Sequence, residues 1–143
     1  MVKSSKINVG ITVGDPNGIG IEIILKSLSN FSLFHECNFI IYASTSLIEK
    51  QKQHFQIDTP PLKKIDSEED LSETQINVKE VFSNSQFNFG ESDKELSELG
   101  ILSLKEATKA IKDKKIDVLV TAPINKDLSF SESFKYTGHT DFL

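Results

Sequence analysis

The chain has 143 residues, of which 38% are hydrophobic and 26% charged, so it can form one packed domain and is not extensively disordered. Its 16 basic residues, all lysine, and 21 acidic residues leave a net charge of -5, which argues against a nucleic-acid partner because such binding requires a basic surface. A single cysteine excludes an internal disulfide. The sequence contains no apolar run long enough to span a membrane and no recognisable secretion signal. We therefore expect a cytoplasmic protein with no membrane partner.

The first third of the chain alternates apolar strands with helices. Residues 7–13 are β-branched and mostly apolar, which predicts a buried strand, and the glycine-rich turn 14–20 follows it. From residue 19 to about 28 the apolar residues recur at helical spacing. Residues 37–43 predict a second buried strand, and residues 44–55 predict a second helix. This repetition indicates an α/β fold built on a mainly parallel sheet with flanking helices.

The middle of the chain is more polar. Residues 58–90 contain Pro60 and Pro61, the acidic run 67–70 and few large apolar side chains. We interpret this segment as an exposed excursion that contains at most one short strand, near residues 76–81.

The clearest helix and strand of the sequence come next. Ser92 and Glu95 form a capping-box pattern before a helix that we expect at about 93–114. Gly100 weakens such a helix by about 1 kcal/mol relative to alanine, unless packing requires the absence of a side chain. Residues 116–121 predict a strand.

Three short segments carry residues suited to chemistry. In the turn after the first strand, glycines permit close backbone approach and the next helix offers free N–H groups to an anion. A tight turn without a ligand explains the same residues, and Asp15 is more typical of a turn residue than of a substrate contact. Lys126, after the last strand, could bind a phosphate or carboxylate, or it is a solvated lysine in the first turn of a helix. His139 and Thr140 could bind an anionic group, or they lie at a capped helix start.

Taken together, three segments resemble one enzyme family. The sequences ITVGDPNGIGIEI at 11–23, DVLVTAPINKDL at 117–128 and YTGHTDFL at 136–143 resemble, in this order, the N-terminal part of 4-hydroxythreonine-4-phosphate dehydrogenases, the PdxA family of vitamin B6 (pyridoxine) biosynthesis. The resemblance implies the α/β fold of the isocitrate and isopropylmalate dehydrogenases, incomplete in this chain, and a homodimer. It also implies NAD-dependent oxidation of 4-phosphohydroxy-L-threonine, followed by decarboxylation to 3-amino-2-oxopropyl phosphate, with a divalent metal cation that polarises the reacting hydroxyl.

The resemblance also assigns roles to residues. It implies that His139 and Thr140 bind the phosphorylated substrate. Further candidates for binding, matched less closely, are Gly14, Asp15, Asn17, Gly18 and Lys126. Asn17 stands where family members usually carry a small residue, so that it either alters the close packing or adds a polar contact. No catalytic base is identified.

The principal departure from the family is length. Family members are much longer, and the resemblance places their three metal-binding histidines downstream of the region that this chain covers. Neither His35 nor His54 matches a metal-ligand position. We therefore expect residues 1–143 to be the N-terminal portion of a longer two-domain α/β dehydrogenase, and we expect this portion alone to bind no catalytic metal and to be inactive.

Other functions remain open at this stage. A related dehydrogenase could act on a phosphorylated threonate or on an aromatic cis-dihydrodiol acid, because the segments present here concern only the binding of a phosphate or an acid. A non-catalytic α/β binding module that retains only this portion is the alternative outside enzymes.

Overall fold

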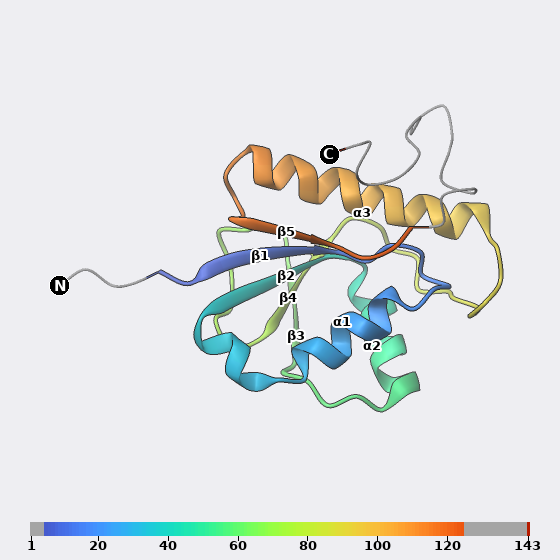
Figure 1. Ribbon diagram of the computed structural model, residues 1–143, viewed down its shortest axis with the longest axis horizontal. Helices are drawn as coiled ribbons and strands as arrows, with labels where there is room; N and C mark the ends of the chain where they lie inside the picture. Colours follow the sequence, from blue (N-terminus) through green and yellow to red (C-terminus); the bar gives the residue numbers. More distant parts are fainter. Residues whose placement is uncertain (1–4, 125–142) are drawn as a thin grey trace.

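A five-stranded sheet lies between two layers of helices in the computed structural model, which describes residues 5–124 and 143 (Figure 1). In chain order the elements are β1 (Ile7–Thr12), α1 (Gly20–Leu28), the 3-10 helix η1 (Phe31–His35), β2 (Cys37–Ala43), α2 (Thr45–Phe55), β3 (Leu62–Ile65), β4 (Ile76–Glu80), α3 (Lys94–Lys112) and β5 (Val118–Thr121). The predicted α/β fold class is confirmed. None of the helices between residues 5 and 124 is both long and apolar enough to cross a membrane.

The strands lie in the order β3-β4-β2-β1-β5, and every neighbouring pair is parallel. From β1 the chain passes to β2 on one side, whereas β5, the last strand of the order, pairs with β1 on the other side. The strand order therefore reverses at β1, between β2 and β5. In open parallel sheets, ligands bind beside the carboxyl ends of the strands at such a reversal.

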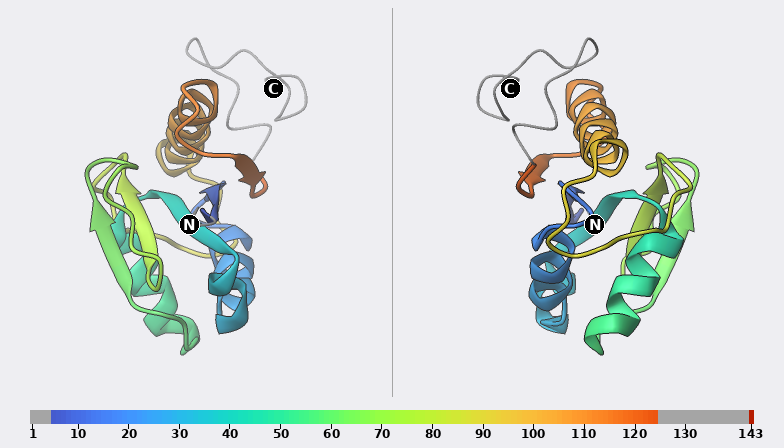
Figure 2. Two further views of the ribbon diagram at one scale, coloured as in Figure 1. Left: turned by 90° about the vertical axis from the view of Figure 1, so that its left-hand side faces the viewer. Right: turned by 90° about the vertical axis from the view of Figure 1, so that its right-hand side faces the viewer.

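The two helical layers bury different apolar surfaces of the sheet. Figure 2 shows α3 on one face and α1 with α2 on the other. The larger cluster packs α1 and α2 against the sheet through residues that include Val9, Ile11, Ile24, Leu25, Ile41 and Leu47. The smaller cluster packs α3 against the opposite face and includes Ile40, Tyr42, Ala107, Ala110 and Ile116. Because parallel strands are usually covered on both faces, this arrangement explains why β1 and β2 have near-continuous apolar sequences.

Side-chain caps fix where two helices begin. The Ser44 hydroxyl accepts a hydrogen bond from the N–H of Leu47 at the start of α2, so the first residue of the predicted helix is its cap. At the start of α3 the capping residue is Asp93, whose carboxylate accepts the N–H of Leu96 at 3.1 Å. The cap therefore lies one residue after the predicted Ser92, and Leu96 stands where a capping box would need Glu or Gln.

The segment 58–90 is not an exposed excursion throughout, which corrects the prediction from sequence. It contributes two strands, β3 and β4, and Ile65 at the end of β3 is buried. The carboxylate of Glu68 is also buried, where it accepts hydrogen bonds from the Tyr42 hydroxyl and the Lys79 ammonium, both at 3.1 Å. The acidic run was interpreted as solvated, but one of its members is neutralised by a lysine of the neighbouring strand.

Candidate functional site

The loops after β1 and β5 meet at the carboxyl edge of the sheet. The N–H of Asp15 donates to the carbonyl oxygen of Pro123 at 3.1 Å, and the N–H of Ala122 donates to the carbonyl oxygen of Thr12 at 3.3 Å. Two of the segments singled out in the sequence, about 100 residues apart in the chain, are thus in direct contact. They lie where the strand order reverses, which is the position expected for a ligand site in a sheet of this kind.

Close packing explains two of the glycines near this edge. Gly14 has a φ of +67°, and a side chain there would collide with the carbonyl group of Pro123. A Cβ atom on Gly100, in α3, would lie 2.5 Å from the carbonyl oxygen of Gly14. Gly14 and Gly100 therefore let β1, β5 and α3 approach one another, and the gap left by each missing side chain is filled by protein backbone.

Asn17 joins the glycine turn to the loop between β4 and α3. Its side-chain amide donates to the carbonyl oxygen of Glu91 at 3.0 Å and accepts the N–H of Asn88 at 2.6 Å. Its own carbonyl oxygen accepts the N–H of Gly90 at 3.1 Å. Asn17 is only 4% exposed, and its two side-chain bonds are partly shielded from water. Of the two possibilities that the sequence left open for Asn17, the structure shows the added polar contact.

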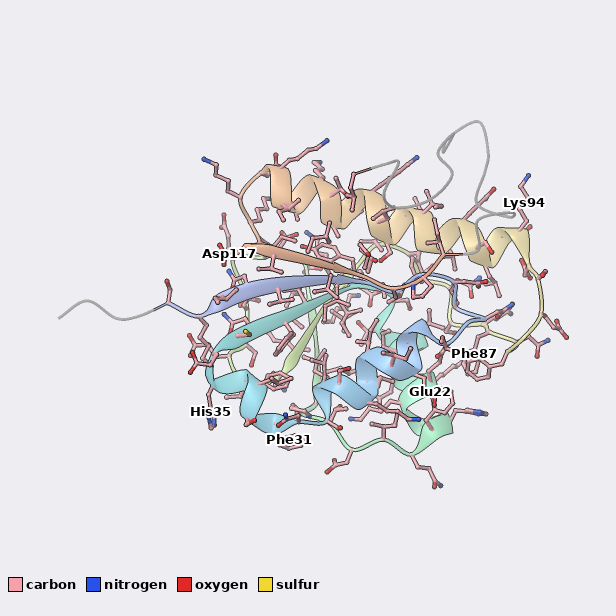
Figure 3. All side chains as sticks on the ribbon, in the orientation of Figure 1. Glu22, Phe31, His35, Phe87, Lys94 and Asp117 are labelled. Atoms are coloured by element: carbon pink, nitrogen blue, oxygen red, sulfur yellow. The ribbon has the colours of Figure 1, made fainter. Side chains whose placement is uncertain are left out.

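An aromatic cluster holds the same loop against α2. His54 and Phe55 of α2 contact Phe87 and Phe89 of the loop, with ring centroids between 4.9 and 6.0 Å apart. In Figure 3, Phe87 lies at the same end of the sheet as Lys94, the first residue of α3, whereas Asp117 lies at the opposite end. The loop is therefore positioned over the carboxyl edge by hydrogen bonds from one side and by ring packing from another.

Asp15 lies in the turn with its carboxylate half-buried. The carboxylate accepts the N–H of Asn17 at 2.9 Å, which is the bond of a turn-forming aspartate. Burial raises the pKa of Asp15, the hydrogen bond from Asn17 opposes this effect, and the negative charge of Asp93 adds to it. The geometry agrees with the interpretation of Asp15 as a turn residue.

A polar hollow of about 400 Å³ lies between the loop and the start of α3. It is lined by Lys50, Ser85, Gln86, Phe87, Asn88, Glu91, Asp93 and Leu96. The Lys50 ammonium donates to the Ser85 hydroxyl at 3.0 Å, and the carboxylates of Glu91 and Asp93 line the same space. Because both signs of charge are present, the hollow alone does not indicate an anion site.

The structure brings together four of the predicted binding residues. Gly14, Asp15, Asn17 and Gly18 all belong to the turn after β1. The roles of Asn88 and Glu91 could not be predicted, since only contacts distant in sequence give them a part in the site. The other predicted binding residues, Lys126, His139 and Thr140, lie outside the described residues.

Metal ligands were predicted to lie elsewhere in the protein. Among residues 5–124 and 143, no three histidine, cysteine, aspartate or glutamate side chains gather in a group that could hold a metal ion. This part of the chain therefore does not fit the catalytic cation that the resemblance implies, and no chemical step through a metal can be derived from it.

Comparison with protein families decides the classification. The family model described as "Pyridoxal phosphate biosynthetic protein PdxA" matches residues 35–143. The chain belongs to the PdxA family. This agrees with the three segments that suggested the family from sequence, although the glycine turn lies before the matched region.

Curated relatives match nearly the whole of this chain and are more than twice as long. The chain is 34% identical over 137 residues to a 4-hydroxythreonine-4-phosphate dehydrogenase of Sulfurihydrogenibium sp., covering 96% of this chain and 42% of the relative. It is 29% identical to the enzyme of the same name from Bacteroides thetaiotaomicron, covering 99% of this chain and 39% of the relative. A third relative, from Oceanobacillus iheyensis, is named "Putative D-threonate 4-phosphate dehydrogenase". It is 30% identical to this chain, which spans 43% of its length.

Solved structures of PdxA proteins have the same fold over the region that this chain covers. A 4-hydroxythreonine-4-phosphate dehydrogenase from Klebsiella pneumoniae superposes with a TM-score of 0.79 at 27% identity, over 95% of this chain and 42% of that one. The Burkholderia phymatum enzyme superposes with a TM-score of 0.86 at 24% identity, over 98% of this chain and 43% of that one. The chain therefore has the fold of about two fifths of a PdxA dehydrogenase, consistent with an N-terminal portion.

Proposed function

We propose that this chain is the N-terminal portion of an NAD-dependent dehydrogenase that acts on 4-phosphohydroxy-L-threonine in pyridoxal phosphate biosynthesis. The observation that carries the proposal is the contact between the glycine turn and the end of β5, made by the hydrogen bond from Asp15 to Pro123. It joins two family segments where the strand order reverses. Relatives at 34% and 29% identity are named for this activity.

The proposed reaction has two stages. Oxidation at C3 converts the hydroxyl to a ketone: the hydroxyl proton passes to a base, and NAD+ accepts the hydride. The resulting β-keto acid would then lose CO2, because the neighbouring ketone can take up the electron pair of the breaking bond as an enolate. Protonation of the carbon that carried the carboxylate would give 3-amino-2-oxopropyl phosphate. His139 and Thr140 are proposed to bind the phosphate, with backbone or side-chain support from the glycine turn.

The proposal also covers the metal, the cofactor and the assembly. We assign the divalent metal ligands and most of the NAD site to polypeptide beyond residue 143, and we propose that the complete protein works as a homodimer in the cytoplasm. In support of this assignment of the NAD site, the turn after β1 in this chain does not follow the glycine spacing of the common dinucleotide-binding turn. The 143-residue chain alone is accordingly proposed to be inactive.

One alternative substrate has a specific observation in its favour. The Oceanobacillus iheyensis relative, named for D-threonate 4-phosphate, is 30% identical to this chain, close to the values for the two relatives named for 4-hydroxythreonine 4-phosphate. Both substrates carry a phosphate and a carboxylate, so the residues proposed to bind phosphate do not separate them.

A comparison of substrates tests the proposed function. This sequence would be continued by the C-terminal remainder of the Sulfurihydrogenibium relative, and NAD reduction would be measured with each phosphorylated acid and a divalent metal. Preferential turnover of 4-phosphohydroxy-L-threonine supports the proposal, and preference for D-threonate 4-phosphate replaces it with the alternative. A folded protein that turns over neither substrate favours a binding module. Turnover by the 143-residue chain alone contradicts the proposed division of the site.

A further inference from the structure

Gln51 places a polar side chain on the buried face of α2. The buried residues of this helix are Leu47, Ile48 and Gln51, which recur at helical spacing, and Gln51 is fully buried. Its Nε2 donates to the carbonyl oxygen of Pro16 at 2.9 Å, whereas its Oε1 has no hydrogen-bond partner among the described residues. An apolar side chain would avoid the cost of burying an unpaired acceptor, so the packing of α2 alone does not explain a glutamine here.

The bond from Gln51 fixes one side of the peptide group between Pro16 and Asn17. In a trans peptide the C=O and the N–H lie in one plane and point in opposite directions, so neither can turn without the other. The N–H of this peptide belongs to Asn17 and donates to the Asp15 carboxylate at 2.9 Å. Gln51 and Asp15 therefore hold the same peptide group from opposite sides.

This peptide group lies between the two contacts that the glycine turn makes with other loops. Just before it, the N–H of Asp15 bonds to the carbonyl oxygen of Pro123, after β5. Just after it, the Asn17 side chain bonds to Asn88 and Glu91, in the loop between β4 and α3. A rotation of the peptide would carry the Asn17 side chain away from that loop. The orientation of this one peptide therefore determines how the turn is joined to the rest of the carboxyl edge.

We propose that Gln51 is a positioning residue of the proposed substrate site: by holding the carbonyl oxygen of Pro16, it fixes the glycine turn that supports phosphate binding. The inference rests on the proposed function for the identity of the ligand, but not for the geometry of the turn. Figure 2 shows α2 on the same face of the sheet as α1, the helix that begins at the end of the turn. Because Gln51 is fully buried, it acts on the substrate only through the turn.

Amide hydrogen exchange on the 143-residue chain tests the effect on the turn. Gln51→Met keeps the length of the side chain and removes both its donor and its unpaired acceptor. The amide of Asn17 is expected to exchange at least about tenfold faster than in the unmodified protein, whereas the amides of β2 should keep their protection. Gln53→Met is the matched control, because Gln53 is an exposed glutamine of the same helix and its replacement should change neither. Unchanged exchange at Asn17, or an equal acceleration in β2, would overturn the proposal.

A second variant, Gln51→Glu, tests whether the donor itself is required. Burial favours the protonated form of a carboxyl group, and in that form the O–H can donate to the carbonyl oxygen of Pro16. In acid the Asn17 amide should therefore exchange as slowly as in the unmodified protein at the same pH. At higher pH, where the introduced carboxyl group ionises, Asn17 should exchange faster than in the unmodified protein. Fast exchange of Asn17 in acid, with the amides of β2 still protected, would contradict the proposal.

Kinetics of the longer polypeptide, in which the C-terminal remainder of the Sulfurihydrogenibium relative continues this sequence, test the effect on the substrate. Gln51→Met should raise the KM for the phosphorylated acid that is oxidised about tenfold, with kcat and the KM for NAD nearly unchanged, because the turn is proposed to support the phosphate and not the reacting carbon. Gln53→Met should alter none of these values.

The two kinds of measurement separate the possible failures. An unchanged KM in a Gln51→Met variant whose Asn17 amide exchanges rapidly would overturn the positioning role. A fall in kcat at constant KM would indicate a smaller folded fraction, and would overturn it as well. If the unmodified longer polypeptide oxidises neither phosphorylated acid, the proposed function fails and the substrate role of Gln51 fails with it, whereas the exchange data still decide whether Gln51 fixes the turn.

Discussion

Gly100 faces the carbonyl oxygen of Gly14 so closely that a methyl group on its Cα would lie 2.5 Å from that oxygen. A glycine in the interior of a 19-residue helix weakens the helix, so its presence requires a compensating contact. Here the compensation is the approach of α3 to the turn after β1. The hydroxyl of Ser103, one turn further along α3, reinforces it by accepting the N–H of Val13 at 3.1 Å.

The first prediction follows from this contact. Gly100→Ala should destabilise the protein by about 1–3 kcal/mol, because the steric overlap with Gly14 outweighs the gain of about 1 kcal/mol in helix propensity. Urea unfolding followed by circular dichroism measures the change. Leu102→Ala, on the exposed side of the same helix, is the control and should change stability by less than about 1 kcal/mol. A more stable Gly100→Ala variant would show that α3 can move away from the turn.

The second prediction concerns the loop that Asn17 holds. Asn17→Ala removes the bonds to Glu91 and Asn88 and should cost about 0.5–2 kcal/mol, because two hydrogen bonds at part-buried positions are lost. Amide exchange at Asn88 should accelerate more than at residues of β2. Asn84→Ala removes a bond to Gln86 within the same loop and serves as the control, with little effect expected on the Asn88 amide. Unchanged exchange at Asn88 would mean that the aromatic cluster alone positions the loop.

The sequence predicted most of the sheet but missed one strand. The runs that form β1, β2 and β5 are apolar and bounded by turn residues, so their spacing was sufficient to identify them. β3 has the sequence Leu-Lys-Lys-Ile and lies between a proline pair and an acidic run. It can carry two lysines because it is an edge strand, which has one free side and tolerates charge. Short polar edge strands of this kind are hard to tell from loops when only the sequence is known.

The contacts that build the candidate site could be foreseen from the sequence only in part. The glycine turn and the end of the last strand could be placed together because both follow strands of one parallel sheet. The use of Gly14 and Gly100 for close packing, and the three bonds of Asn17, depend on contacts between segments 70 to 110 residues apart. Local residue patterns do not contain this information.

The third prediction uses the raised pKa of Asp15, which burial causes and Asp93 increases. Because the folded protein then binds the proton more tightly than the unfolded chain does, the stability contributed by Asp15 is largest below pH 3.8 and falls as the pH rises through the folded pKa. Asp15→Asn cannot ionise but keeps the acceptor for the N–H of Asn17. Its melting temperature should exceed that of the unmodified protein at pH 7, and this gain should disappear in acid. A gain that is the same at both pH values would contradict this account of Asp15.

The fourth prediction concerns Glu68, whose pKa is lowered, whereas that of Asp15 is raised. Burial alone would raise the pKa of Glu68, but the backbone, the Lys79 ammonium and the Tyr42 hydroxyl together lower it. Its ionisation therefore contributes stability above pH 4.5 that is lost as the pH falls through the folded pKa. Glu68→Gln should destabilise the protein by about 1.5–3 kcal/mol at pH 7, with a smaller loss in acid, measured by urea unfolding at each pH.

An exposed ion pair supplies the control for Glu68→Gln. Asp70 pairs with Lys63 at 3.3 Å, but its side chain is 76% exposed, so Asp70→Asn should change stability by less than about 0.5 kcal/mol. If both variants lose the same stability, the buried position of Glu68 has no energetic consequence, and the link that it forms between the acidic run and Lys79 is incidental.

The fifth prediction tests the residue on which the proposed substrate contact depends. In the longer polypeptide, His139→Ala should weaken binding of the phosphorylated substrate by about 1–3 kcal/mol and leave NAD affinity unchanged, because one hydrogen bond to a charged group is lost. Titration calorimetry with each ligand separates the two effects. His54→Ala is the matched control: this imidazole packs against Phe55 and Phe89, so its removal should lower the melting temperature without changing substrate affinity. Equal losses of substrate affinity in the two variants would place the phosphate away from His139 and would leave the turn at Gly14 and Lys126 as candidates for its binding.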